Sequence, residues 1–193
     1  MSPYHPVQLD DSLPTVAFQG APGAFSEEAA YAFFGPEIRT VPVAAFQDVA
    51  DRVLDGTTDY GIIPVENSLV GPVEPALKAL STAELAEVGA QVHPIELCFL
   101  TLPGAELRGI RRVLSHPVAL GQCTAFQAAR PEIEPQPWYD TAGAARHIAE
   151  RAEPELAAIA GRGAAMRYQL EVLFPNIEDR RDNRTYFVIV ERE

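Results

Sequence analysis

The sequence predicts an α/β fold with a largely parallel sheet, and two observations support this prediction. Short apolar segments of strand length alternate with segments of helical periodicity along most of the 193 residues. Polar and small residues follow the apolar segments, at the points where the strands of such a sheet end. Helices that connect successive strands in this way cover a sheet whose strands run in parallel.

The first unit of this pattern is a strand expected at 15–19 (TVAFQ), ended by Gly20, and a helix expected at 25–34 (FSEEAAYAFF), ended by Gly35. The same pairing then repeats along the chain. Further strands are expected at 41–43, 60–65, 111–116, 136–140 and 156–161. Further helices are expected at 45–56, 73–80, 120–130, 142–151 and 163–170.

The segment that follows residue 80 fits two descriptions. Ser81 to Glu84 matches a helical capping box. The apolar residues after it reach Gly89 and Pro94 too soon for a long helix. We therefore expect 85–102 to be mostly strand.

The composition argues against several classes of function. With 47% apolar residues, the chain can bury a core of its own. The formal net charge of −12 is spread along the chain and would repel nucleic acid. No apolar stretch is long enough to span a membrane, and the first residues lack the basic and apolar regions of a signal peptide. We expect a cytoplasmic protein in which residues 1–14 are a loose lead-in.

Cysteine, histidine and lysine are too sparse to favour metal or Schiff-base chemistry. Cys98 and Cys123 have no CxxC partners and are expected to be buried packing residues. The four histidines form neither an HExxH motif nor any close pairing with cysteine. The single lysine, Lys78, is expected to face solvent, which argues against a Schiff base. We therefore expect no metal ion and no pyridoxal cofactor.

Five of the expected strand ends carry small or polar residues. Ligands bind beyond the carboxyl ends of strands in open α/β sheets, so these five groups are expected to converge. Each group also fits a structural role, since Ser, Thr, Asp and Asn cap helices and Gly and Pro form turns. The loop GAPGAFS matches neither common phosphate-binding motif, and the pattern favours a small carboxylate as ligand. The five groups are 20–26, 66–68, 115–117, 140–143 and 161–163.

Several motifs together resemble the prephenate dehydratase family. VENS at 65–68, followed by Gly-Pro-Val at 71–73, and SHPVALGQC at 115–123 are specific signals for it. GAPGAFSEEAA, DTAGAA, AAIAGRGAAMRYQLEVL and the terminal DNRTYF occur in the order and spacing of the family. DTAGAA is also similar to the form seen in arogenate dehydratases. The resemblance covers about residues 15–190, nearly the whole chain.

The resemblance implies a two-lobed α/β fold like that of the type II periplasmic binding proteins, with the active site in the cleft between the lobes. We expect 15–94 and 177–193 to form the first lobe and 95–176 the second, so that the chain crosses near residue 94 and near 175–179. Family members usually carry a C-terminal ACT domain that binds phenylalanine and inhibits the enzyme. Because this sequence ends at Glu193, we expect no ACT domain and no feedback through one.

The resemblance also implies the reaction, in which prephenate loses carbon dioxide and water to give phenylpyruvate, on the route to phenylalanine, without a cofactor. Thr185 matches the catalytic threonine of the family, and its hydroxyl is expected to assist the departing substrate hydroxyl. Glu66 is a candidate partner if burial raises its pKa, and His116 is another candidate acid. Substrate contacts are expected from Ser26, Asn67, Ser68, Ser115, His116, Thr141, Asn183 and Phe187.

Structural roles stay open for several of these residues. Thr185 is also a β-branched strand former, and Glu66 is equally suited to pair with an arginine. His116 and the proline after it are also turn residues.

One position departs from the family pattern, whose usual ending is Thr-Arg-Phe. This chain has Tyr186 in place of the arginine. An arginine there either binds a substrate carboxylate or supports the structure. Arg184 is one residue away, and adjacent strand residues face opposite sides of a sheet. Arg180 and Arg181 are therefore the candidates to reach in from the loop.

Two other functions stay open beside prephenate dehydratase. Arogenate carries an amino group where prephenate has a keto oxygen, so an arogenate dehydratase would use the same cleft. A non-catalytic cleft that binds an aromatic acid is the second alternative. The partner expected in all cases is a small molecule, and the resemblance implies a homodimer.

Overall fold

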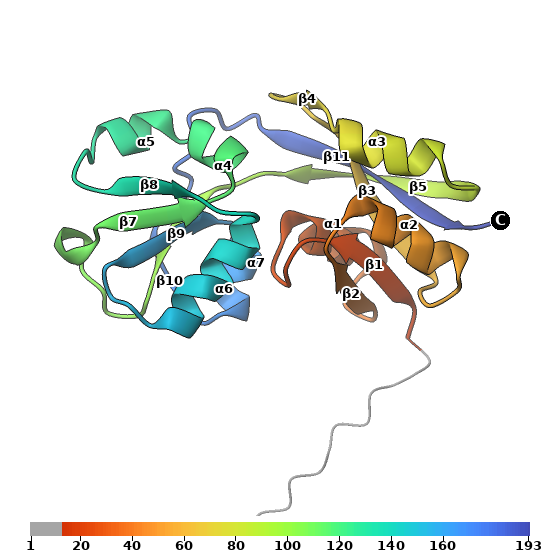
Figure 1. Cartoon of the computed structure of the whole chain (residues 1–193), viewed down its shortest axis with the longest axis horizontal. Helices are drawn as coiled ribbons and strands as arrows, with labels where there is room; N and C mark the ends of the chain where they lie inside the picture. The colour runs from red at the N-terminus through yellow and green to blue at the C-terminus, as the bar shows by residue number, and fades with distance from the viewer. Residues whose placement is uncertain (1–12) are drawn as a thin grey trace, which may run out of the picture.

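Two β-sheets with their helices form two lobes that lie side by side (Figure 1). The computed structural model describes residues 13–193, so residues 1–12 of the expected lead-in lie outside the described part. The first lobe is built on a six-stranded sheet and the second on a five-stranded sheet. The α/β class predicted from the alternation of strands and helices is confirmed. The expectation of a largely parallel sheet is wrong, because both sheets combine parallel and antiparallel strand pairs.

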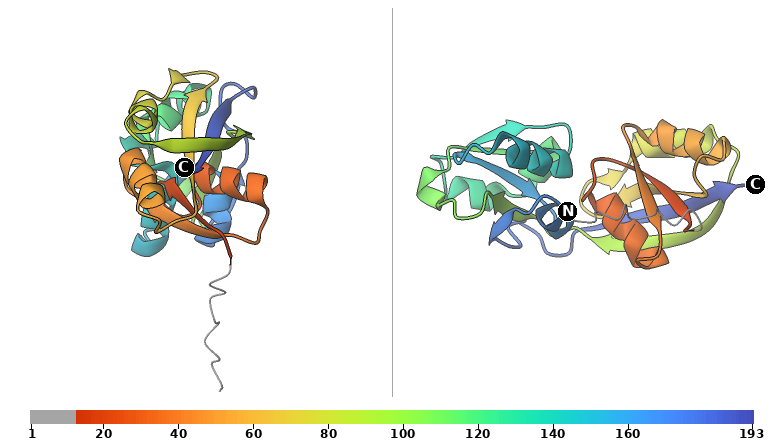
Figure 2. Two further views of the ribbon diagram at one scale, coloured as in Figure 1. Left: turned by 90° about the vertical axis from the view of Figure 1, so that its right-hand side faces the viewer. Right: turned by 90° about the horizontal axis from the view of Figure 1, so that it is seen from below.

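The first sheet contains one antiparallel strand in its interior. Three strands, β2, β1 and β3, run in parallel, and β11 lies antiparallel between β3 and β5. Figure 2 shows β11 and β5 side by side along the first lobe. The last strand of the chain is therefore held within the sheet that the first strands begin. Across the sheet the strands are β2 (Arg39–Val43), β1 (Thr15–Gln19), β3 (Tyr60–Asn67), β11 (Arg184–Arg192) and β5 (Leu85–Pro94), with β4 (Gly71–Pro72) beside β3.

The second sheet is parallel at one side and antiparallel at the other. β7 runs parallel to both β8 and β9, whereas β6 is antiparallel to β9 and β10. All five residues of β9 are buried, as expected for a strand with neighbours on both sides and helices over the sheet. Across the sheet the strands are β10 (Glu171–Phe174), β6 (Cys98–Thr101), β9 (Leu156–Ala160), β7 (Arg112–Ser115) and β8 (Glu134–Pro137).

Most of the expected elements are confirmed. The strand at 15–19 and the helix at 25–34 have the predicted bounds, and 85–102 is mostly strand, as β5 and β6. No helix within residues 13–193 has the length and apolar character needed to cross a membrane. The helices are α1 (Phe25–Phe34), α2 (Phe46–Leu54), α3 (Glu74–Ser81), α4 (Pro117–Gly121), α5 (Thr124–Ala128), α6 (Thr141–Arg151) and α7 (Arg162–Arg167), with a 3₁₀ turn at Leu107–Gly109.

The single helix expected at 120–130 is wrong, because two short helices occupy this region. α4 begins directly after His116, whose ring nitrogen accepts a hydrogen bond from the backbone of Val118. The carboxylate of Asp179, far along the chain, accepts hydrogen bonds from the backbone N–H groups of Thr124 and Ala125 at 2.9 Å each. A carboxylate in this position caps a helix start, so α5 begins there.

Two crossing segments join the lobes and are bonded to each other. The first connects β5 to β6 and the second connects β10 to β11. Ile95 N–H donates to Asn183 O at 3.0 Å, and Ile177 N–H donates to Leu97 O at 2.8 Å. Ile177 also packs in a core cluster of the second lobe. The returning chain therefore leaves the second lobe only after Ile177.

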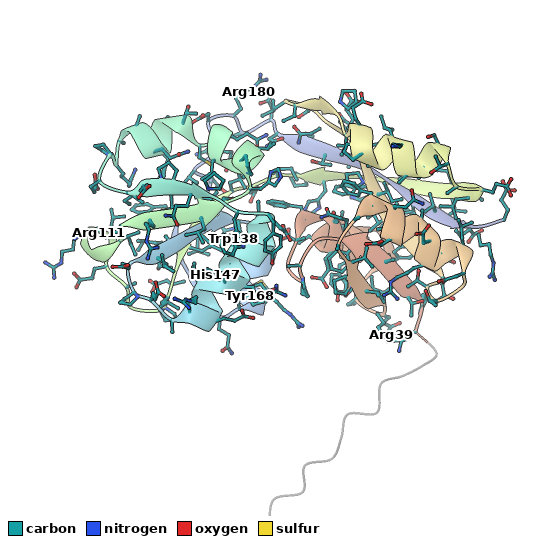
Figure 3. All side chains as sticks on the ribbon, in the orientation of Figure 1. Arg39, Arg111, Trp138, His147, Tyr168 and Arg180 are labelled. Carbon is teal, nitrogen blue, oxygen red and sulfur yellow. The ribbon has the colours of Figure 1, made fainter. Side chains whose placement is uncertain are left out.

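The loop between β1 and α1 supplies a separate contact between the lobes. Ala21 N–H donates to Asp140 Oδ2 at 2.6 Å, and the hydroxyl of Tyr168, labelled in Figure 3, donates to Pro22 O at 2.7 Å. The largest core cluster accordingly contains residues of both lobes, among them Phe18 and Leu100. The lobes are thus packed against each other beyond the crossing segments.

Gly23 makes the closest approach in this contact and provides a test of it. Its φ is +88°, and an added Cβ would lie 2.7 Å from Ala164 Cα in the second lobe. We expect Gly23→Ala to lower the unfolding free energy by about 2–4 kcal/mol, because backbone strain and overlap add. The measurement is urea denaturation. Gly104→Ala is the matched control, since Gly104 has φ +77° and nothing within 4 Å. Equal losses of unfolding free energy in both variants would show that overlap between the lobes does not contribute to the loss in Gly23→Ala.

Candidate active site

A cavity of about 610 Å³ is lined by residues of both lobes. This volume lies in the usual range for small-molecule sites. The first lobe contributes the ends of β1 and β3, the start of α1 and the beginning of β11. The second lobe contributes α4 and the residues that precede and begin α6. Most of these are carboxyl ends of strands or amino ends of helices, as expected for an α/β ligand site.

Thr185 and Phe187 face this cavity because they alternate along β11. Thr185 is 8% exposed and lies opposite Asn67 of β3 in the strand register, and Phe187 is 2% exposed. Arg184 and Tyr186 point to the other side of the strand and are exposed. The predicted placement of a threonine hydroxyl at the cleft therefore follows from strand geometry.

The amide of Asn67 fixes the hydrogen-bonding direction of Thr185. Asn67 Oδ1 accepts from the backbone N–H groups of Leu69 at 3.0 Å and Val70 at 3.1 Å. Its Nδ2 must then face the other way, where it lies 3.0 Å from Thr185 Oγ1 and donates to it. Because the threonine oxygen accepts this bond, the hydroxyl proton is left to be donated to a ligand.

Two further hydroxyls line the cavity without a protein partner. Ser26 lies in the first turn of α1 and is 8% exposed, and Thr141 is the first residue of α6. Within residues 13–193, neither side chain forms a hydrogen bond to another residue. Backbone N–H groups in the first turn of a helix also lack intrahelical partners. Both hydroxyls are therefore available to a polar ligand group.

His116 also lines the cavity, and its contacts indicate the position of its proton. Its Nδ1 accepts a hydrogen bond from Val118 N–H at 3.3 Å at the start of α4. In a neutral ring that accepts at Nδ1, the proton is on Nε2. His116 thus combines a helix-capping role, where the sequence suggested only a turn residue, with a second donor at the cavity.

The cavity lining has little charge, and what it has is negative. No lysine or arginine is among the lining residues that the structure describes, whereas the carboxylates of Glu74 and Asp140 are. The Asp140 carboxylate is occupied, since it accepts from Ala21 N–H at 2.6 Å and from Ala142 N–H at 3.2 Å. An anionic ligand would therefore depend on neutral hydrogen-bond donors.

Glu66 and Ser115 do not line the cavity. Glu66 is exposed, because it precedes Asn67 on β3 and faces the opposite side of the strand. Glu66 therefore lacks the burial that its expected role as an acid required. Ser115 is completely buried at the end of β7 and donates its hydroxyl to Ile159 O of β9 at 2.6 Å. That bond joins two strands of the second sheet.

Ser68 and Asn183 also lie outside the lining. Ser68 is exposed, donates its hydroxyl to Asp182 O at 3.2 Å and accepts from Arg184 N–H at 3.0 Å. Asn183 is 1% exposed, and its amide is bonded to side chains of both lobes. Both residues therefore contact protein groups where substrate contacts were expected.

The arginines proposed to replace the family arginine do not line the cavity either. Arg180 forms a bidentate pair with Asp182, with Nε to Oδ1 at 3.0 Å and a terminal nitrogen to Oδ2 at 2.6 Å. Figure 3 shows Arg180 on the outer side of the returning segment. Tyr186 itself lies opposite Glu66 of β3 and Val92 of β5, on the exposed face of the strand. This position is on the face of the sheet away from the cavity.

Sequence reasoning missed several lining residues, of which Gln122 matters most. Gln122 ends α4, lines the cavity and accepts a hydrogen bond at Oε1 from Asn183 Nδ2 at 3.0 Å. It belongs to the SHPVALGQC motif, and a polar residue at the end of an otherwise apolar helix was the available signal. The other polar residues missed are Gln19, Glu74 and Tyr139, whereas Asp140 belongs to the group expected at 140–143.

The two cysteines are buried and free, in accordance with the expected packing role. Burial raises the pKa of the Cys123 thiol to about 12, so this thiol stays protonated near neutral pH. No group of histidine, cysteine or carboxylate residues suited to a metal ion is found within residues 13–193.

The position of Tyr186 yields a test of the departure from the family pattern. We expect Tyr186→Arg to raise the unfolding free energy by about 0.2–1 kcal/mol, because an arginine there can pair across the strands with Glu66. The specificity constant for prephenate, the substrate that the resemblance implies, should stay within about twofold. Urea denaturation and initial rates measure the two quantities. The gain should vanish when Glu66→Gln is added. A tenfold change in the specificity constant would contradict the outward position.

Comparison with known proteins gives one family match. Residues 16–193 match the family model described as prephenate dehydratase. Arogenate dehydratase 1 of Petunia hybrida is 36% identical over 97% of this chain and 44% of its own length. The chain therefore spans less than half the length of this relative.

Two solved structures are similar over 93% of this chain. Prephenate dehydratase from Arthrobacter aurescens, in complex with L-Phe, is 31% identical with a TM-score of 0.85 over 60% of its own length. A protein described as GqqA, a novel type of quorum quenching acylase, is 36% identical with a TM-score of 0.84 over 64% of its own length. On the match of its family model to nearly the whole sequence, this chain belongs to the prephenate dehydratase family.

Proposed function

We propose that this chain carries the active site of a lyase that converts prephenate into phenylpyruvate, carbon dioxide and water. The single observation that carries the proposal is the hydroxyl of Thr185, which faces the cavity with its oxygen occupied by Asn67 at 3.0 Å. A hydroxyl in this state has its proton free to donate to a ligand. The activity of the longer relatives is a proposal for this chain, which matches only part of their length.

The reaction needs positioning and one donated proton. The bond between the ring and its carboxylate breaks, and its electron pair completes the aromatic ring as carbon dioxide leaves. The bond to the ring hydroxyl breaks at the opposite carbon, and the hydroxyl leaves as water once it receives a proton. Formation of the aromatic ring drives both cleavages, so orientation and acid assistance are the main catalytic contributions required.

The residue roles follow from the donors at the cavity. Thr185 donates to the departing hydroxyl, and since threonine is a weak acid, it relays or orients the proton. The Nε2–H group of His116 is a second hydrogen-bond donor at the cavity. Ser26 and Thr141 bind the carboxylates through their free hydroxyls, and Phe187 packs against the ring.

Arogenate is the alternative substrate. It has the same ring, ring carboxylate and hydroxyl, so the donors described above would serve it equally. The Petunia hybrida relative, at 36% identity, is named for arogenate, and the Arthrobacter aurescens structure, at 31% identity, is named for prephenate. The two substrates differ only in the keto or amino group of the side chain.

The acylase description of one similar structure does not lead to a second candidate function. Acyl transfer by a side-chain nucleophile requires a serine, threonine or cysteine activated by a neighbouring base. Within residues 13–193, the lining serine and threonine hydroxyls are those of Ser26, Thr141 and Thr185, and none of them has a hydrogen bond to a histidine or a carboxylate.

The cytoplasmic location and the homodimer remain predictions. Sedimentation velocity at several protein concentrations would test the dimer directly.

The choice of substrate is tested by incubating the protein with prephenate and with arogenate in parallel. Phenylpyruvate is followed by its absorbance in alkali and phenylalanine by chromatography. We expect phenylpyruvate from prephenate with the higher specificity constant. Phenylalanine formed more efficiently from arogenate would favour the alternative substrate. Binding of both acids by calorimetry without either product would instead support a non-catalytic binding module.

The role of Thr185 is tested by Thr185→Val, which keeps the branched shape and removes the hydroxyl. We expect the specificity constant to fall about 10²- to 10⁴-fold, the range for loss of general acid assistance. Thr185→Ser is the matched control, because it keeps a donor hydroxyl in the same position. It should retain activity within about tenfold of the parent. Thermal unfolding should change little in both variants, and parental activity in Thr185→Val would eliminate the role.

A further inference from the structure

Asn183 forms a side-chain link between a polar group of the first lobe and one of the second lobe beside the cavity. It lies in the returning crossing segment and is 1% exposed. Its Oδ1 accepts from Asn67 Nδ2 of the first lobe at 2.8 Å, and its Nδ2 donates to Gln122 Oε1 of the second lobe at 3.0 Å. One buried amide therefore connects a residue beside Thr185 with a residue at the end of α4.

The direction of both bonds is determined by the backbone. Asn67 Oδ1 is bonded to the N–H groups of Leu69 and Val70, so Asn67 can offer only its Nδ2 to Asn183. Asn183 therefore accepts this hydrogen bond with its Oδ1, and its Nδ2 faces Gln122. The oxygen of Gln122 is the group that accepts.

The bond between Asn183 and Gln122 determines which atom of the Gln122 amide faces the cavity. Gln122 lines the cavity, and its Oε1 is held by Asn183. Its Nε2 has no hydrogen bond to another residue of the described chain, so this amide offers its two protons to a ligand. Without Asn183 the Gln122 amide is free to turn and present its oxygen, which would repel a carboxylate.

We infer that Asn183 is a positioning residue that holds Gln122 as a donor to an anionic group of the substrate. This inference rests on the proposed function, because it assigns the Gln122 amide to a carboxylate of that substrate. Asn183 does not touch the cavity itself, and it acts through Gln122. The same bond connects the second lobe to the crossing segment that leads into β11.

The test is Asn183→Asp, which keeps the shape of the side chain, replaces its donor by an acceptor and adds a buried negative charge. The new carboxylate still accepts from Asn67, so the contact beside Thr185 is kept. Gln122 must turn its Nε2 towards the carboxylate and present Oε1 to the cavity. We expect KM for prephenate to rise about 10- to 100-fold, the effect of losing a hydrogen bond to a charged group, with kcat changed much less.

The double variant distinguishes a positioning role from loss of stability. If Asn183 acts through Gln122, Asn183→Asp combined with Gln122→Ala should raise KM no further than Gln122→Ala alone. Thr15→Val is the matched structural control, since Thr15 is 6% exposed and its hydroxyl donates to Asp59 at 2.7 Å, away from the cavity. It should lower the melting temperature and leave KM unchanged. Additive KM effects, or a fall in kcat at constant KM, would overturn the inference.

A second variant and a binding measurement distinguish the possible outcomes. If Asn183→Asp does not fold, Asn183→Ser, which is uncharged and too short to reach both partners, should show the same rise in KM. Calorimetric binding of phenylpyruvate separates this inference from the proposed function. A parent protein that binds phenylpyruvate without turning over prephenate refutes the dehydratase activity, and weaker binding in Asn183→Asp would still support the positioning role. Equal binding of phenylpyruvate by both proteins, together with an equal affinity for prephenate, would refute it.

Discussion

The position of β11 between β3 and β5 is the constraint on which the site depends. An antiparallel strand that enters the sheet here turns alternate residues towards the cavity, so Thr185 and Phe187 face it and Tyr186 does not. β11 follows all strands of the second lobe in sequence. The first sheet is therefore complete only when the chain has passed through the second lobe and returned. The cavity therefore acquires its threonine only when contacts distant in sequence have formed.

Local patterns predicted the elements because their signals lie within a few residues. The strand at 15–19 and the helix at 25–34 end at glycines that the sequence displays. The break between α4 and α5 depends on Asp179, which is distant in sequence and reaches the helix start only in the folded chain. No local pattern contains that information.

The sequence predicted which motifs contribute to the candidate site more accurately than which of their side chains face the cavity. Ser26, Asn67, His116, Thr141, Thr185 and Phe187 line the cavity. Glu66, Ser68, Ser115 and Asn183 come from the same motifs and do not, because neighbouring residues of a strand or turn face different sides. Resemblance to a family identifies such motifs as segments of sequence and does not say which of their side chains face the cavity. The side of the strand that each residue occupies follows from register, and register is a property of the sheet.

The absence of a lysine or arginine among the described lining residues suits the proposed reaction. The ring carboxylate of prephenate leaves as neutral carbon dioxide, so its charge disperses as the transition state is approached. A cation paired with that carboxylate would stabilise the bound substrate more than the transition state and would slow the reaction. Neutral donors such as the Ser26 and Thr141 hydroxyls hold the substrate with less of this penalty. The hydroxyl at the opposite carbon gains negative charge instead, and there a hydrogen-bond donor, the role proposed for Thr185, has the greater effect.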